Sequence, residues 1–94
     1  PALSLYYWRN QQRYEVDFVL REKEHTVSLI QVSYVHQGEA IPNREVRNLA
    51  LAAKHLSCEN LILVTWDMSG IHLLDGRRIR LVPLSEFLTK EFQS

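Results

Sequence analysis

The chain has 94 residues, 46% of them hydrophobic, which is enough apolar material for the core of one small domain. Eleven basic residues balance eleven acidic ones, which argues against a domain dominated by positive charge but leaves room for a local basic patch. The single cysteine, Cys58, excludes an internal disulfide and favours a reduced thiol in the cytoplasm.

No apolar run approaches the roughly 20 residues that a helix needs to cross a bilayer, so we expect no membrane partner. The chain begins at Pro1, and its only methionine is Met68. We therefore interpret residues 1–94 as a single domain that forms the C-terminal fragment of a longer protein.

Three strands are predicted at the start of the chain, over residues 4–9, 13–21 and 26–34. The first is rich in aromatic side chains, and a polar turn at residues 10–12 follows it. A short charged connection joins the second strand to the third. Because short connections join antiparallel neighbours, we expect an antiparallel meander.

A helix is predicted over residues 44–57, after a loop marked by Gly38 and Pro42. Asn43 is the expected N-cap, since an asparagine side chain can accept a bond from a free N–H of the first turn. Apolar residues recur at helical spacing and predict one buried stripe. The stripe consists of Val46, Leu49, Ala50, Ala53 and Leu56.

The remaining elements are predicted to be three strands and a short helix. The apolar run at 61–66 is typical of a strand that is covered on both faces. Strands at 71–74 and 78–82 flank an Asp-Gly pair, which predicts a hairpin. Pro83 then begins a closing helix. Strands and helices mix around one sheet, so the fold class is α/β or α+β with a mixed β-sheet.

Polar side chains occur in pairs on two neighbouring predicted strands. Strand side chains alternate, so Glu15 and Asp17 share one face of their strand, and Gln31 and Ser33 share one face of the next. The simplest register brings the two pairs together. One alternative is a sheet face that simply meets water, although an aspartate inside a strand is unfavourable and such departures concentrate at functional sites. The opposite face of the first of these strands is expected to hold Val16, Phe18 and Leu20.

The segments that carry these pairs resemble a known domain. YYWRNQQRYEVDFVL followed by SLIQVSY is similar to the PD-(D/E)XK nuclease-like C-terminal domain, of unknown function, of a family of prokaryotic AAA-type ATPases. The shared features are WR, EVDF and their spacing, and IRLVPLSEFL resembles the closing strand and helix. The resemblance implies a restriction-endonuclease-like core whose first helix lies upstream of this fragment. It also implies an upstream ATPase domain as partner, with ATP bound only there, and DNA as a further partner.

The resemblance also implies roles for four positions. Asp17 and Gln31 stand where the family holds a divalent cation, Mg²⁺, and the carbonyl of Val32 is a third ligand. Ser33 stands at the lysine position, which helps to position the attacking water. Two of these positions depart from the signature, with Gln31 in place of an acid and Ser33 in place of the lysine. We therefore expect weak Mg²⁺ binding and a degenerate site.

Two residues could compensate for these changes. Glu15 is on the same strand as Asp17, but one strand repeat places it about 7 Å away. Lys54 could supply an amine from the following helix, although an outward lysine on a helix is usually just solvated.

The leading hypothesis is a catalytically degenerate, nuclease-like accessory domain of an ATPase that acts in nucleic-acid binding or protein interaction. The first alternative is an active divalent-metal-dependent nuclease that uses Asp17 and Gln31. The second is a structural module whose polar face mediates homo-oligomerisation. Three arginines, Arg77, Arg78 and Arg80, are the expected nucleic-acid contacts. They are equally consistent with a charged hairpin that keeps a sheet edge soluble.

Overall fold

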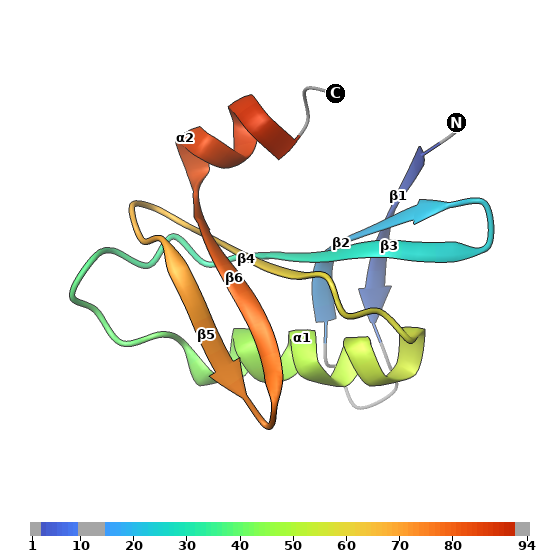
Figure 1. Cartoon of the computed structure of the whole chain (residues 1–94), viewed down its shortest axis with the longest axis horizontal. Coiled ribbons are helices and arrows are strands. Elements are labelled where there is room, and N and C mark those ends of the chain that lie inside the picture. Colours follow the sequence, from blue (N-terminus) through green and yellow to red (C-terminus); the bar gives the residue numbers. More distant parts are fainter. Residues whose placement is uncertain (1–2, 10–14, 92–94) are drawn as a thin grey trace.

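A computed structural model describes residues 3–9 and 15–91 of the chain (Figure 1). It confirms the predicted order of three strands, a helix, a strand, a hairpin and a closing helical segment. It also confirms an α+β fold with a mixed sheet. The elements are β1 (Leu3–Arg9), β2 (Glu15–Glu22), β3 (His25–Val32), α1 (Asn43–Leu56), β4 (Leu61–Thr65), β5 (Gly70–Leu74), β6 (Arg77–Pro83), α2 (Leu84–Glu86) and the π-helical turn η1 (Phe87–Glu91).

One six-stranded sheet carries all of these strands, in the order β1-β2-β3-β4-β6-β5. The first three strands form the predicted antiparallel meander. β3, β4 and β6 then run parallel to one another, and β5 returns antiparallel to β6 at the edge. Every residue of β4 is buried, because this central parallel strand is covered on both faces.

Two apolar clusters lie on the two faces of the sheet. We call them the α1 face and the α2 face, after the helices that cover them (Figure 1). Side chains of β3, β4 and β6 alternate between the two faces. On the α1 face lie Leu29, Leu61, Leu63, Ile79 and Leu81. On the α2 face lie Ile30, Ile62, Val64 and Val82, with Phe87 from η1.

A β-bulge in β2 changes which of its side chains reach the core. Tyr6 pairs with Val19 and Trp8 pairs with Val16, so two steps on β1 oppose three steps on β2. The extra residue breaks the alternation. Val16 and Val19 are both buried in the α1-face cluster, whereas Phe18 is exposed. The prediction that Val16, Phe18 and Leu20 share one face is therefore wrong, because it assumed an unbroken pleat.

The ends of α1 and β3 also differ from the sequence prediction. Asn43 is the first helical residue, and the N-cap is Pro42, which makes no side-chain cap bond. The predicted capping role of Asn43 is therefore wrong. β3 ends at Val32, and shortly beyond it the backbone of Tyr34 takes a positive φ of 61° that a strand cannot continue through. The predicted turn at 10–12 lies outside the described residues.

The buried stripe of α1 is wider than predicted. Val46, Leu49 and Ala53 are buried as expected, but Ala50 and Leu56 are only half-buried. Asn48 and Ala52 are buried in addition. Among the described residues, no helix combines the length and the apolar composition that crossing a membrane requires.

Candidate functional site

Two hydrogen bonds join Asp17 of β2 to β3, one with the side chain of Gln31 and one with the backbone of Val32. The backbone N–H of Asp17 donates to Oε1 of Gln31 at 3.1 Å. The backbone N–H of Val32 donates to Oδ2 of Asp17 at 2.9 Å. We call this arrangement the Asp17–Gln31 bridge. The two strands therefore bring Asp17 together with Gln31, as the simplest register predicts, and Asp17 also contacts the backbone N–H of Val32.

The bridge forms where the ladder between β2 and β3 stops. The last pair of that ladder is Phe18 with Ile30, immediately before the bulge diverts β2. Beyond this point a backbone N–H on each strand needs another acceptor, because a buried N–H without a partner is costly. The side chains of Asp17 and Gln31 supply the two acceptors. The polar pair therefore continues the strand pairing past the bulge.

Gln31 lies on the α1 face of the sheet, and Ser33 follows shortly after the end of β3. Gln31 pairs with Leu63, a residue of the α1-face cluster, and only 8% of Gln31 is exposed. The backbone N–H of Ser33 donates to the carbonyl of Val64 at 2.9 Å. The Ser33 hydroxyl oxygen is buried and has no hydrogen-bond partner among the described residues. These side chains are thus largely enclosed, unlike those of a sheet face that meets water.

Glu15 belongs to a different group of side chains, on the β1 side of β2. Its carboxylate accepts a bond from Nε of Arg9 at 3.2 Å in an exposed ion pair. A hydrogen bond with the Tyr7 hydroxyl, assisted by Arg9, holds the pKa of Glu15 below its ordinary value. The same bond raises the pKa of Tyr7. Glu15 is therefore engaged with β1 and does not stand in for the acid that the resemblance predicts at position 31.

The side chains of the bridge do not form a good Mg²⁺ site. Mg²⁺ prefers several hard oxygen ligands in octahedral geometry, with carboxylates supplying the charge. Here Asp17 is the only anionic group, and its Oδ2 already accepts the Val32 N–H. Oε1 of Gln31 accepts the other N–H. Nowhere in the described part of the chain do three or more histidine, cysteine or acidic side chains gather as metal ligands.

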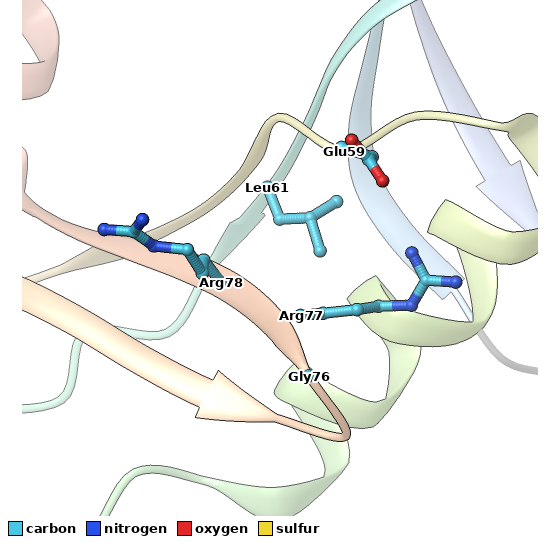
Figure 2. Close-up of a pocket in the computed structure, with 5 residues that line it drawn as sticks. All are labelled: Glu59, Leu61, Gly76, Arg77 and Arg78. Carbon is cyan, nitrogen blue, oxygen red and sulfur yellow. The ribbon is translucent and has the colours of Figure 1, made fainter.

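The three predicted arginines do not form one patch, because β6 directs them to different faces. Figure 2 shows Arg77 and Arg78 pointing to opposite sides of the strand. Arg77 lies two residues before Ile79 and so shares the α1 face with it. Arg78 and Arg80 share the α2 face with Val82. A small cavity of about 210 Å³ opens beside the first two. Its lining consists of Glu59, Leu61, Gly76, Arg77 and Arg78 (Figure 2).

Arg77 instead joins two cations of α1 around a larger groove of about 690 Å³. We call it the α1–hairpin groove, since it lies between α1 and the β5–β6 hairpin. Its lining consists of Arg47, Ala50, Leu51, Lys54, Leu74, Asp75 and Arg77. A neighbouring hollow of about 510 Å³ shares Lys54 and Arg77 with it. The sequence predicts Lys54 on the outward side of the helix, but the approach of Arg47 and Lys54 to Arg77 depends on tertiary packing.

The bridge and the groove lie at opposite ends of the parallel strands. Gln31 is in register with Leu63, and Leu63 with Leu81, so the bridge is level with the second half of β6. Arg77 begins that strand. Arg77 is therefore separated from Gln31 by roughly 13 Å along the strand direction and by roughly 10 Å across the two strand spacings from β3 to β6. Lys54 lines a hollow with Thr26 and Val27 at the start of β3, whereas Gln31 lies near the end of that strand. Lys54 is therefore not placed to supply the amine that the resemblance predicts at Ser33.

Comparison with known proteins places the chain in a family. Residues 1–87 match the family described as Domain of unknown function (DUF4143). The chain belongs to the DUF4143 family. The match includes the Asp17–Gln31 bridge and all three groove cations of this DUF4143 domain. No curated protein matches the sequence.

Proposed function

We propose that this DUF4143 domain is a non-catalytic, nuclease-like accessory domain of a cytoplasmic AAA-type ATPase and that it binds nucleic acid. The likeness of its WR, EVDF and IQVS segments to the PD-(D/E)XK pattern supports the nuclease ancestry. The topology agrees with that ancestry, because three antiparallel strands, a helix and a parallel strand follow in order. The upstream ATPase domain of the same protein is the proposed partner.

The Asp17–Gln31 bridge is the observation that carries the loss of catalysis. A metal-dependent nuclease needs oxygen ligands directed at a cation, with enough negative charge to hold it. In this domain the matching oxygens accept backbone N–H groups and hold two strands together. The amide of Gln31 also contributes no charge. The bridge is therefore better suited to strand pairing than to metal binding.

The second catalytic requirement is also unmet. A cation beside the attacked phosphate stabilises developing negative charge, and losing one such group typically costs a hundredfold to a thousandfold in rate. Ser33 is short and uncharged, and its hydroxyl is buried. With Lys54 at the other end of the sheet, no described side chain takes over this role.

Nucleic-acid binding is supported by cations that the fold leaves unpaired. Within the described residues, Arg47, Lys54 and Arg77 make no ion pair, although the whole chain is neutral. Unpaired lysine and arginine side chains are the usual contacts to a phosphate backbone. A domain that keeps such contacts without catalysis would tether an ATPase to nucleic acid.

The test combines a cleavage assay, a metal titration and a DNA-binding measurement on the purified domain. We expect no cleavage of plasmid or linear DNA with Mg²⁺ or Mn²⁺, and calorimetric metal affinity no tighter than millimolar. Metal-dependent cleavage that disappears in Asp17→Asn would show an active nuclease and overturn the non-catalytic assignment. Failure to bind a DNA duplex at 50 mM salt would remove the nucleic-acid assignment.

A gain-of-function variant examines the same ancestry from the other direction. Gln31→Glu restores the second acidic ligand beside Asp17, and Ser33→Lys restores the amine. We expect Gln31→Glu alone to raise Mn²⁺ affinity at least about tenfold, since a carboxylate pair attracts a divalent cation that a single carboxylate does not hold. The addition of Ser33→Lys should matter only when the metal is bound. Unchanged affinity in the double variant would mean that these strands do not form a metal site.

A further inference from the structure

We propose that the α1–hairpin groove is the surface that binds nucleic acid, and that it holds the sugar–phosphate backbone of duplex DNA. This inference rests on the proposed function and locates its contacts. Three residues provide them, Arg47 and Lys54 from α1 and Arg77 from the start of β6. The groove is distinct from the Asp17–Gln31 bridge, which lies at the far end of the parallel strands.

The charge of the groove favours an anionic occupant. Of the described residues that line it, three are cationic and one, Asp75, is acidic. Within the described residues, none of the three groove cations forms an ion pair with an acidic side chain. Clefts lined by one sign of charge above an apolar wall focus the field and attract counter-ions.

The spacing of the cations suits an extended polyanion better than a single ion. Arg47 and Lys54 are seven residues apart on one side of α1, which is roughly 10 Å along the helix axis. That distance is about the rise of three base pairs of B-DNA, at about 3.4 Å each. Arg77 reaches the groove from the hairpin, on the wall opposite α1. The three charges are therefore spread along two walls of the groove and do not converge on one point.

The floor of the groove favours the phosphate backbone over unpaired bases. Its apolar residues are Ala50, Leu51 and Leu74, and none of the described residues that line it is aromatic. Single-stranded nucleic acid is usually held by aromatic rings on which bases stack. A duplex backbone needs only spaced cations and makes sequence-independent contacts. An acidic peptide carries similar charge, but peptide recognition relies on side-chain pockets or strand pairing in addition.

The experiment measures duplex binding by fluorescence anisotropy over a range of salt concentrations. The groove variant carries Arg47→Gln, Lys54→Gln and Arg77→Gln. The control variant carries Lys23→Gln, Arg44→Gln and Arg78→Gln, which removes the same charge outside the groove. Affinity falls as salt rises, so the slope of log affinity against log salt is negative. Each lost phosphate contact should reduce the magnitude of that slope by about 1. We expect the groove variant to lose about 3 in slope and on the order of 10²-fold in affinity at 0.1 M salt. The control should change less than threefold.

The outcomes separate this inference from the proposed function. If the unmodified domain does not bind DNA at low salt, both fail. If it binds and the two variants lose affinity equally, the groove assignment fails and nucleic-acid binding stands. If polyglutamate of matched charge binds more tightly than the duplex at the same salt, the groove is a site for acidic proteins and the inference is overturned. Should the triple variant unfold, Arg47→Gln and Lys54→Gln on the exposed face of α1 are measured singly, each with a slope loss of about 1.

Discussion

At the level of single residues, Asp17 shows how an acidic side chain can act as part of the backbone pairing between two strands. Its Oδ2 accepts the N–H of Val32, and its own N–H reaches Gln31. An aspartate is unfavourable in a strand interior by propensity. Here the cost is offset because the bulge leaves backbone donors that a short acidic side chain can reach.

Replacing Asp17 tests this structural role directly. Asp17→Ala removes the acceptor of the Val32 N–H, so we expect a loss of about 1–3 kcal/mol in the free energy of unfolding. Asp17→Asn keeps a carbonyl oxygen and should cost less. Urea denaturation measures both, with Glu24→Ala as a control that removes an exposed acid. An alanine variant as stable as the parent would instead mark Asp17 as a residue retained for function at the expense of stability.

Cys58 leads to a prediction about pH. Burial raises the pKa of its thiol above the ordinary value, because the thiolate is poorly solvated there. Because the pKa of the thiol is higher in the folded state than in the unfolded state, the fold favours the protonated thiol. The resulting contribution to the free energy of unfolding is fully present at pH values below the unfolded pKa of about 8.5. This contribution is lost as pH rises through the folded pKa.

The parent should therefore lose more stability than Cys58→Ala between pH 8 and pH 10. Other titrating groups, such as Tyr7, are common to both proteins and cancel in the comparison. Urea denaturation at several pH values provides the measurement. Parallel pH profiles for the two proteins would show that the thiol titrates normally in the folded state.

At the level of elements, the end of α1 carries local backbone strain. Ser57 is the C-cap and adopts the left-handed conformation, with φ of 52°. Glycine is the residue most often found in the left-handed conformation at a helix end, because it has no Cβ and adopts a positive φ without steric cost. The backbone N–H of Ser57 donates to the carbonyl of Ala53, which closes the helix in this conformation.

Ser57→Gly should stabilise the domain. Relief of the left-handed strain, partly offset by the larger entropy of glycine in the unfolded chain, predicts a gain of about 0.5–1 kcal/mol. Thermal and urea denaturation measure it. Ser69→Gly is the matched control, because Ser69 is exposed and does not have a positive φ. A gain of the same size in the control would point to a cause other than strain at the helix end.

At the level of the whole molecule, burial falls from the centre of the sheet to its edges. Each residue of β4 is buried, whereas β5 at the edge has Gly70, Ile71 and Leu73 exposed. Both helical layers cover the central strands. Strands that open only when the whole domain unfolds should therefore lie in the middle of the sheet.

Amide hydrogen exchange should follow this gradient. We expect the hydrogen-bonded amides of β4 to exchange at least about tenfold more slowly than those of β5, since edge strands open by local fluctuation. Exchange followed by mass spectrometry or NMR provides the comparison, with β6 as an internal reference between them. Equal protection of β4 and β5 would mean that the sheet opens as one unit.

The order of elements and the fold class could be read from local patterns. The Asp-Gly pair predicts the β5–β6 hairpin, and the apolar run at 61–66 predicts the buried strand β4, which ends one residue earlier, at Thr65. These inferences succeed because turn chemistry and hydrophobic runs act between near neighbours. The polar pairs likewise indicated that Asp17 and Gln31 meet. Each of these inferences depends on residues close together in sequence or on a simple strand register.

Tertiary structure decided the features that depend on pairing between distant segments. The bulge at Asp17 and Phe18 arises from the mismatch between β1 and β2, and it reverses the faces that simple alternation assigns. The predicted arginine cluster divides because successive β6 residues point to opposite faces of the sheet. Arg77 meets Arg47 and Lys54 only because α1 packs beside the hairpin. Sequence periodicity describes one element at a time, whereas the bridge and the groove are each built from two.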